Sequence, residues 1–96
     1  MTIEPINLDD KLAQFNATWT PHIIAELNGQ QVKLAKLEGE LTWHDHADED
    51  ELFLVLTGRI TMQMRDEQDE VVEQIIDPGE IIVIPRGLEH NPIADP

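Results

Sequence analysis

The sequence predicts an all-β domain of the sandwich or barrel type. From Pro21 onward, apolar and polar residues tend to alternate, which is the period of a strand rather than of a helix. The strand-like runs are short, and turns that contain Gly or Pro separate them at regular intervals. Short strands with regular turns are typical of sandwiches and barrels.

Composition limits how this small chain of 96 residues can be stabilised. A chain of this size buries only about two-thirds of the surface that its unfolded form exposes, so its core has little reserve. The absence of cysteine excludes disulfides, thiolate metal sites and cysteine nucleophiles. Any additional brace must therefore come from a metal ion or from oligomerisation.

The chain is strongly acidic, with 20 acidic and 6 basic residues and a formal net charge of −14. Such a field repels nucleic-acid phosphates and anionic lipid, which argues against binding to nucleic acid or to a membrane surface. The sequence has no basic-then-apolar leader and no apolar run long enough to span a membrane. We therefore expect a soluble, cytoplasmic protein.

The N-terminal part predicts an extended lead-in, a short helix and a hairpin. Asn7 occupies an N-cap position before residues 8–15, in which apolar residues recur at helical spacing, and we expect this helix to pack on the main body. Asn28-Gly29 lies between two strand-like runs and predicts a two-residue hairpin turn. His22, at the start of the first run, is interpreted as an ordinary surface or strand-start histidine.

Seven strands are predicted in all. They are residues 23–27, 30–37, 41–46, 52–56, 59–65, 71–76 and 81–84. Residues 52–56 and 81–84 are apolar on both faces, so we expect both faces to be covered. Residues 59–65 alternate with Ile60, Met62 and Met64 on one side, and the acidic residues 66–70 are expected to form a solvated hairpin loop.

Two histidines one residue apart form the most informative local pattern. In a strand, His44 and His46 project from the same face, and Glu51 returns on the next strand. Imidazole with carboxylate suits Mn, Fe, Co, Ni or Zn. An exposed histidine pair on an acidic surface would show the same short pattern, so this pattern alone does not decide.

A longer, two-part pattern surrounds these histidines. The first part is Gly39-x4-His44-x-His46-x4-Glu51-x6-Gly58, and the second is Gly79-x5-Pro85-x-Gly87-x2-His90. Together they resemble the two conserved motifs of the cupin superfamily, in particular its small, single-domain members of the cupin 2 type. Two departures occur outside the ligand positions. Four residues rather than five separate Gly39 from His44, and Ala94 stands where the family usually has asparagine, while Asn91 lies beside His90.

The resemblance implies a jelly-roll (double-stranded β-helix) barrel and a single cupin domain over residues 1–96, with residues 1–18 as lead-in and helix. It also implies that one divalent transition metal (Mn, Fe, Ni, Co or Zn) is bound by four residues. These are His44, His46, Glu51 and His90. Four other carboxylates are nearby, but only Glu51 keeps the family's spacing to Gly58. The four are Asp45, Asp48, Glu49 and Asp50.

With these ligands, strand alternation predicts what lies around the site. Glu40 and Thr42 should share the face of His44 and line the barrel, while Leu41 and Trp43 should point away. Glu40 is either a general base or an exposed strand-end glutamate. Phe53 and Val55 follow Glu51 in phase and should form an apolar floor.

Two classes of function fit such a site. One is a metal-dependent oxygenase or isomerase acting on a small oxygen-bearing molecule, and the other is a non-catalytic module that binds a sugar or an organic acid. No catalytic residue and no organic cofactor are assigned. The chain has no basic cluster for a phosphate. Arg86, near His90, is either a residue that binds an acidic substrate or a turn-exposed arginine, and we expect the latter.

The sequence ends six residues after His90, whereas small cupins generally continue for one or two more strands. We expect either that the sequence is truncated or that a partner subunit closes the barrel. An unfilled sheet edge is a pairing site, and the family resemblance favours a homodimer.

Overall fold

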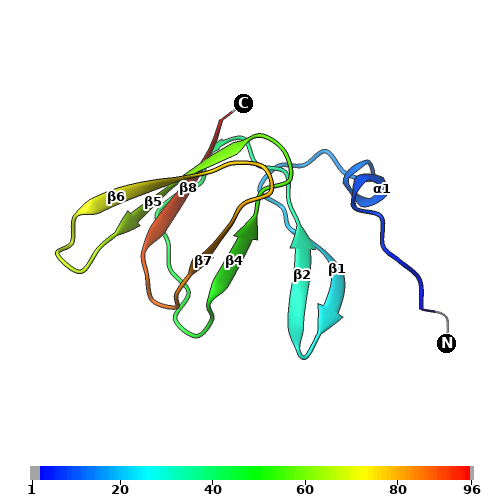
Figure 1. The fold of residues 1–96 in the computed structure, drawn as a ribbon, viewed down its shortest axis with the longest axis horizontal. Helices are drawn as coiled ribbons and strands as arrows, with labels where there is room; N and C mark the ends of the chain where they lie inside the picture. The colour runs from blue at the N-terminus through cyan, green and yellow to red at the C-terminus, as the bar shows by residue number, and fades with distance from the viewer. Residues whose placement is uncertain (1–2, 96) are drawn as a thin grey trace. The chain divides into compact units, whose positions relative to one another are not determined.

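The structure is a computed structural model that describes residues 3–95, and strands dominate it (Figure 1). Met1 and Thr2, where the predicted lead-in begins, lie outside the described residues. The elements, in chain order, are α1 Leu8–Leu12, β1 His22–Leu27, β2 Gln30–Leu34, β3 Gly39–Glu40, β4 Glu51–Leu54, β5 Arg59–Arg65, β6 Val71–Ile76, β7 Ile81–Ile84 and β8 His90–Asp95. No helix within residues 3–95 is long and apolar enough to cross a membrane.

The chain divides into two compact units, Met1–Leu37 and Glu38–Pro96. In the first, Asn7 caps α1 as predicted, because its Oδ1 accepts a hydrogen bond of 2.9 Å from the Asp10 amide. The helix ends at Leu12 rather than at Phe15. Phe15 is held outside it, because its carbonyl accepts a hydrogen bond from Lys36 Nζ and its ring stacks on His22.

The predicted hairpin of the first unit is confirmed. Leu27 pairs with Gln30, and Asn28 and Gly29 both adopt positive φ, at 51° and 76°. Two successive left-handed residues characterise the tight turn that suits the twist of antiparallel strands, and Asn-Gly is the pair that adopts it most readily. His22 is the first residue of β1, as predicted for a strand-start histidine.

The second unit consists of two antiparallel sheets. The larger has the strand order β3-β8-β5-β6, and the smaller is the pair β4-β7 (Figure 1). The rings of Phe53 in β4 and His90 in β8 have their centroids 6.4 Å apart, so the two sheets face one another. Both sheets contribute to the core, and on β5 Ile60 and Met62 are buried as the alternation predicted.

The prediction that residues 52–56 and 81–84 are covered on both faces is wrong. Four apolar side chains of the β4–β7 pair are half exposed or more. They are Leu52, Leu54, Ile81 and Val83, which we call the β4–β7 apolar face. They lie opposite one another in the register, Leu52 with Val83 and Leu54 with Ile81. Only the other side of the pair is covered, where Val55 and Ile84 are buried.

The predicted strand at residues 41–46 is also wrong, because β3 ends at Glu40. Along β8, Glu40 pairs with Ile93 and the next paired residue, His44, bridges His90. The chain advances four residues from Glu40 to His44 but only three from Ile93 to His90. One extra residue therefore lies opposite β8, which is a bulge. The bulge changes the parity, so Glu40 does not share the face of His44 and does not line the barrel. Leu41 and Thr42 are both exposed.

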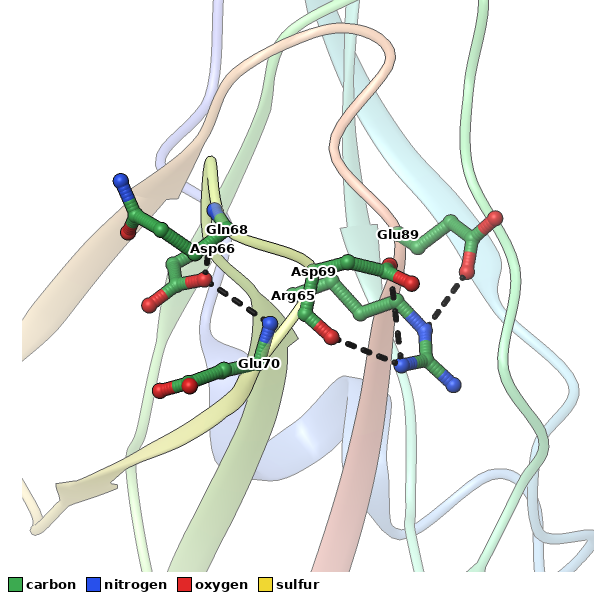
Figure 2. A network of polar contacts seen from close by, with 6 residues as sticks. All are labelled: Arg65, Asp66, Gln68, Asp69, Glu70 and Glu89. Atoms are coloured by element: carbon green, nitrogen blue, oxygen red, sulfur yellow. Dashed lines mark hydrogen bonds and ion pairs between the residues drawn. The ribbon is translucent and has the colours of Figure 1, made fainter.

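The acidic loop between β5 and β6 is a solvated hairpin, as predicted. Asp66 Oδ1 accepts hydrogen bonds of 2.9 Å from the amides of Gln68 and Glu70, and this holds the loop in shape (Figure 2). Arg65 lies between Asp69 and Glu89, with its Nε 3.1 Å from Glu89 Oε2. Arg65, at the end of β5, thus contacts both the loop and Glu89, the residue that precedes β8.

Candidate metal centre

A pair of backbone hydrogen bonds joins the two sequence motifs. His44 N donates to His90 O at 3.0 Å, and His90 N donates to His44 O at 2.9 Å. The Gly87 amide extends this contact with a hydrogen bond of 2.7 Å to His46 O. Directly opposed residues of an antiparallel pair project from the same face, so the His44 and His90 rings lie together, with centroids 4.3 Å apart.

The carboxylate reaches the same place from β4. Glu51 is the first residue of β4 and pairs with Ile84 of β7. Asp50, the residue before Glu51, fixes the start of β4, because its Oδ1 accepts a hydrogen bond of 2.9 Å from the Arg86 amide. The loop before β4 is therefore fastened to the loop that leads toward His90.

These elements bring together the four side chains that the sequence predicted as ligands. Each offers one ligand atom, and these atoms lie within 4.8 Å of one another. The four are His44, His46, Glu51 and His90. Glu51 Oε2 lies 2.9 Å from His46 Nε2 and 3.5 Å from His90 Nε2. The competing carboxylates, Asp45, Asp48, Glu49 and Asp50, are exposed, and they lie outside this group.

The hydrogen bonds of two rings show which nitrogen faces the centre. His44 Nδ1 lies 3.0 Å from Thr42 O, and His90 Nδ1 lies 2.8 Å from Leu88 O. Because a carbonyl oxygen only accepts, Nδ1 carries the hydrogen in both rings, and in the neutral imidazole the lone pair is on Nε2. Backbone hydrogen bonds of this kind orient histidine ligands in metal sites.

The residues fit a cation at this position. Glu51 Oε2 and His90 Nε2 are buried and make no hydrogen bond. A buried polar atom without a partner costs about 1–3 kcal/mol, and a bound cation would satisfy both atoms. Imidazole nitrogens with one carboxylate oxygen are a donor set that divalent transition metals accept.

The site has a closed side and an open side. His90 is only 1% exposed; Phe53 contacts its ring, and Met64 lies opposite it in the register of β5 and β8. The side chains of His46 and Glu51 are 45% and 35% exposed. The half-buried Phe53 and the buried Val55 agree with the predicted apolar floor.

Asn91 was noted in the sequence only as a neighbour of His90, and its burial in a hydrogen-bond network was not predicted. It is fully buried, and its Nδ2 donates to Glu40 Oε1 at 2.6 Å and to Gln63 Oε1 at 3.1 Å. Glu40 thus serves this network on the face opposite His90, and it is not a base in the metal centre. A polar residue between buried neighbours in a strand needs hydrogen-bond partners, and this rule is the feature of the sequence that could have identified Asn91.

Comparison with known proteins identifies the family. The sequence matches the family described as Cupin domain over residues 30–95. The chain belongs to the cupin family. Among curated cupin-type relatives, the uncharacterized protein YdbB of Bacillus subtilis is 37% identical over 68 residues, which is 71% of this chain and 57% of YdbB. Germin-like protein subfamily 3 member 1 of Arabidopsis thaliana is 35% identical over 82 residues, or 78% of this chain and 39% of that protein. The chain therefore spans less than two-thirds of either relative.

Two crystal structures match nearly the whole cupin chain. A cupin-2 domain containing protein from Shewanella frigidimarina has a TM-score of 0.87 and 45% identity, covering 95% of this chain and 84% of that one. Protein NMB1881 from Neisseria meningitidis has a TM-score of 0.81 and 30% identity, covering 96% and 89%. The predicted jelly-roll cupin barrel with a short N-terminal helix is confirmed.

We predict that Asn91→Ala lowers the free energy of unfolding by about 1–3 kcal/mol, because Glu40 and Gln63 lose the donor they share. Urea unfolding measures the change. The matched control is Asn16→Ala, the same substitution at an exposed position, which should stay within about 0.5 kcal/mol of the original protein. Equal effects of the two substitutions would contradict the assigned network.

Proposed function

We propose that this cupin domain binds one divalent transition metal and holds a small oxygen-bearing molecule beside it. The proposed ligands are His44, His46, Glu51 and His90. The observation that carries the proposal is the convergence of their ligand atoms within 4.8 Å, with Glu51 Oε2 and His90 Nε2 buried and without a hydrogen bond. The candidates are Mn, Fe, Ni, Co and Zn, which accept nitrogen and oxygen donors.

The chain's own groups prepare this centre. The carbonyls of Thr42 and Leu88 orient His44 and His90, and Glu51 contributes a negative charge among the imidazoles. Four protein ligands leave two positions on a six-coordinate ion, and open positions distinguish catalytic from structural sites. When bound, such a metal supplies Lewis-acid polarisation of an oxygen atom, and Fe or Mn also supplies redox chemistry.

Two functions follow from this arrangement, and the two open coordination positions favour the first. Because His46 and Glu51 are partly exposed, a small molecule can reach the ligands from solvent. We therefore propose a metal-dependent enzyme of the oxygenase or isomerase kind. The second candidate, a non-catalytic module for a sugar or an organic acid, uses the same site without turnover.

Elemental analysis of the purified protein should find about one divalent transition metal per chain. His44→Ala and His90→Ala should each reduce metal affinity by more than the 10- to 100-fold that is typical for the loss of an outer-shell partner. Isothermal titration with Zn²⁺ and Mn²⁺ measures this.

The control for these variants is His22→Ala, which removes a histidine of the first unit and should leave metal affinity unchanged. A purified protein that contains no metal, and that also fails to take up Mn, Fe, Ni or Zn, would contradict the proposed metal site. Equal losses from all three histidine variants would show that the ligands are misassigned.

Oxygen consumption should distinguish the enzyme from the binding module. Fe- or Mn-loaded protein is screened with catechols, diketones and 2-oxo acids, and products are also analysed for isomerisation. We expect turnover with at least one class and its loss in His44→Ala. Binding of a ligand with no metal-dependent turnover in any class favours the non-catalytic module.

We also propose that two copies of the chain associate through the β4–β7 apolar face. Its four side chains form two cross-strand pairs with no charged residue among them. Contiguous exposed apolar patches often mark interaction sites, and a two-fold axis would place this patch against its own copy. A standard interface buries roughly 800 Å² per partner, so the apolar face would form the centre of a larger contact.

Light scattering coupled to size-exclusion chromatography should therefore find a dimer. Leu54→Lys should convert it to a monomer, because a dimer would bury the added charge. Val71→Lys, the control on β6, places the same charge at another exposed apolar position and should leave the dimer intact. A protein that is monomeric throughout the micromolar range would contradict the proposal.

A further inference from the structure

Arg65 joins two other side chains, Trp43 and Glu89, into one cluster at the end of β5. The guanidinium carbon of Arg65 lies 4.9 Å from the centroid of the Trp43 ring. Its Nε donates to Glu89 Oε2 at 3.1 Å (Figure 2). We call Trp43, Arg65 and Glu89 the Arg65 clasp. The clasp connects the loop before β4 with the residue that precedes β8.

Each member of the clasp lies next to the candidate metal centre in the chain or in the register. Trp43 precedes His44, and Glu89 precedes His90. Arg65 lies one residue beyond the partner of His90 in the pairing of β5 with β8. Successive side chains of a strand point to opposite faces, so Arg65 projects from the face opposite His90. The clasp therefore lies behind the two histidines, on the other face of the larger sheet.

The clasp spans the same two segments that the backbone hydrogen bonds of the site join. His90 belongs to β8, which pairs with β5, and Arg65 N donates to Glu89 O at 3.2 Å. His44 lies outside the named strands, and its two hydrogen bonds with His90 form an isolated bridge. The His44 side of the donor set thus lacks a continuous ladder. The contact between Trp43 and Arg65 connects this side to β5 a second time.

The clasp is too exposed to contribute much to the stability of the whole fold. The side chains of Arg65 and Glu89 are 37% and 53% exposed, and exposed ion pairs stabilise proteins little. What Arg65 supplies is geometry, because its planar guanidinium can lie over the Trp43 ring while Nε donates to Glu89 in a fixed direction. We therefore expect the loss of Arg65 to loosen the two segments locally, without unfolding the domain.

We propose that Arg65 is a positioning residue of the candidate metal centre. By holding Trp43 and Glu89, it keeps the His44 segment against β8. It thereby fixes the separation of the His44 and His90 rings, whose centroids lie 4.3 Å apart. Arg65 acts through the neighbours of the two histidines rather than as a ligand. This inference rests on the proposed function, since it describes how that donor set is held.

Amide hydrogen exchange, followed by NMR on the full chain after chelation of any metal, tests the clasp directly. Arg65→Gln should speed exchange of the His44 and His90 amides roughly three- to tenfold, because their reciprocal hydrogen bonds open more easily. The amide of Met62, which is fully buried in the middle of β5, should change less, since its exchange requires a larger opening.

The same variant tests the consequence for the metal. Arg65→Gln should lower Co²⁺ affinity roughly three- to tenfold by isothermal titration, less than the loss typical of a group that hydrogen-bonds a ligand directly. It should also change the visible absorption spectrum of bound Co²⁺, which reports the geometry of the donors and not the fraction of folded protein. Arg65→Lys keeps the charge but lacks the planar guanidinium, so its affinity should lie between the other two.

The matched control is Arg59→Gln. Arg59 lies at the other end of β5 and pairs with Asp77 at 2.7 Å, so this variant removes an arginine–carboxylate pair of the same kind. It should leave the exchange of both histidine amides and the Co²⁺ spectrum unchanged. Adding Trp43→Leu to Arg65→Gln should cost no more than the larger of the two single effects, as expected for residues that act through one contact.

The outcomes separate this inference from the proposed function. If the original protein takes up no Co²⁺, the proposed function fails, and amide exchange still supports or overturns the clasp. Equal acceleration of the His44, His90 and Met62 amides by Arg65→Gln would show that Arg65 stabilises the whole sheet, which overturns positioning. Unchanged exchange of the histidine amides has the same consequence, as do unchanged Co²⁺ affinity and spectrum in a protein that binds the metal.

Discussion

The candidate metal centre depends on two hydrogen bonds between the main chains of His44 and His90. They join segments that lie 46 positions apart in the sequence, and they set the separation of the two rings before any side chain interacts. On its other edge, β8 is held by β5, so His90 cannot shift without disturbing the larger sheet. The donor set is therefore positioned by the backbone, and a metal would find it already formed.

The bulge between Glu40 and His44 explains why reasoning from the sequence succeeded for some residues and failed for others. Local spacing was sufficient for the hairpin at Asn28-Gly29 and for the inward side of β5, because each depends only on neighbours in the chain. Strand alternation across residues 40–44 predicted the wrong face for Glu40. The reason is that one extra residue opposite β8 moves the Glu40 side chain to the other face of the sheet. Motif spacing identified the four clustered side chains without needing that parity.

Two other features depend on contacts that no local pattern contains. Asn91 meets Glu40 and Gln63 from two different strands, so only the strand order of the larger sheet reveals the network. The apolar character of β4 and β7 was correctly recognised, but a sequence indicates that a face avoids water without indicating what covers it. Within the described chain that face is exposed, so any cover for it must come from another molecule.

The position of β8 in the chain has a consequence for how the protein is made. This strand lies between β3 and β5 and carries His90, yet it leaves the ribosome after both of its neighbours. Until it inserts, the larger sheet is divided and the four donors cannot converge. Sheet completion and site formation are thus one event, governed by pairing between distant segments, which is the slow kind of folding step. Nascent chains that stop before β8 would offer a metal only a partial set of donors.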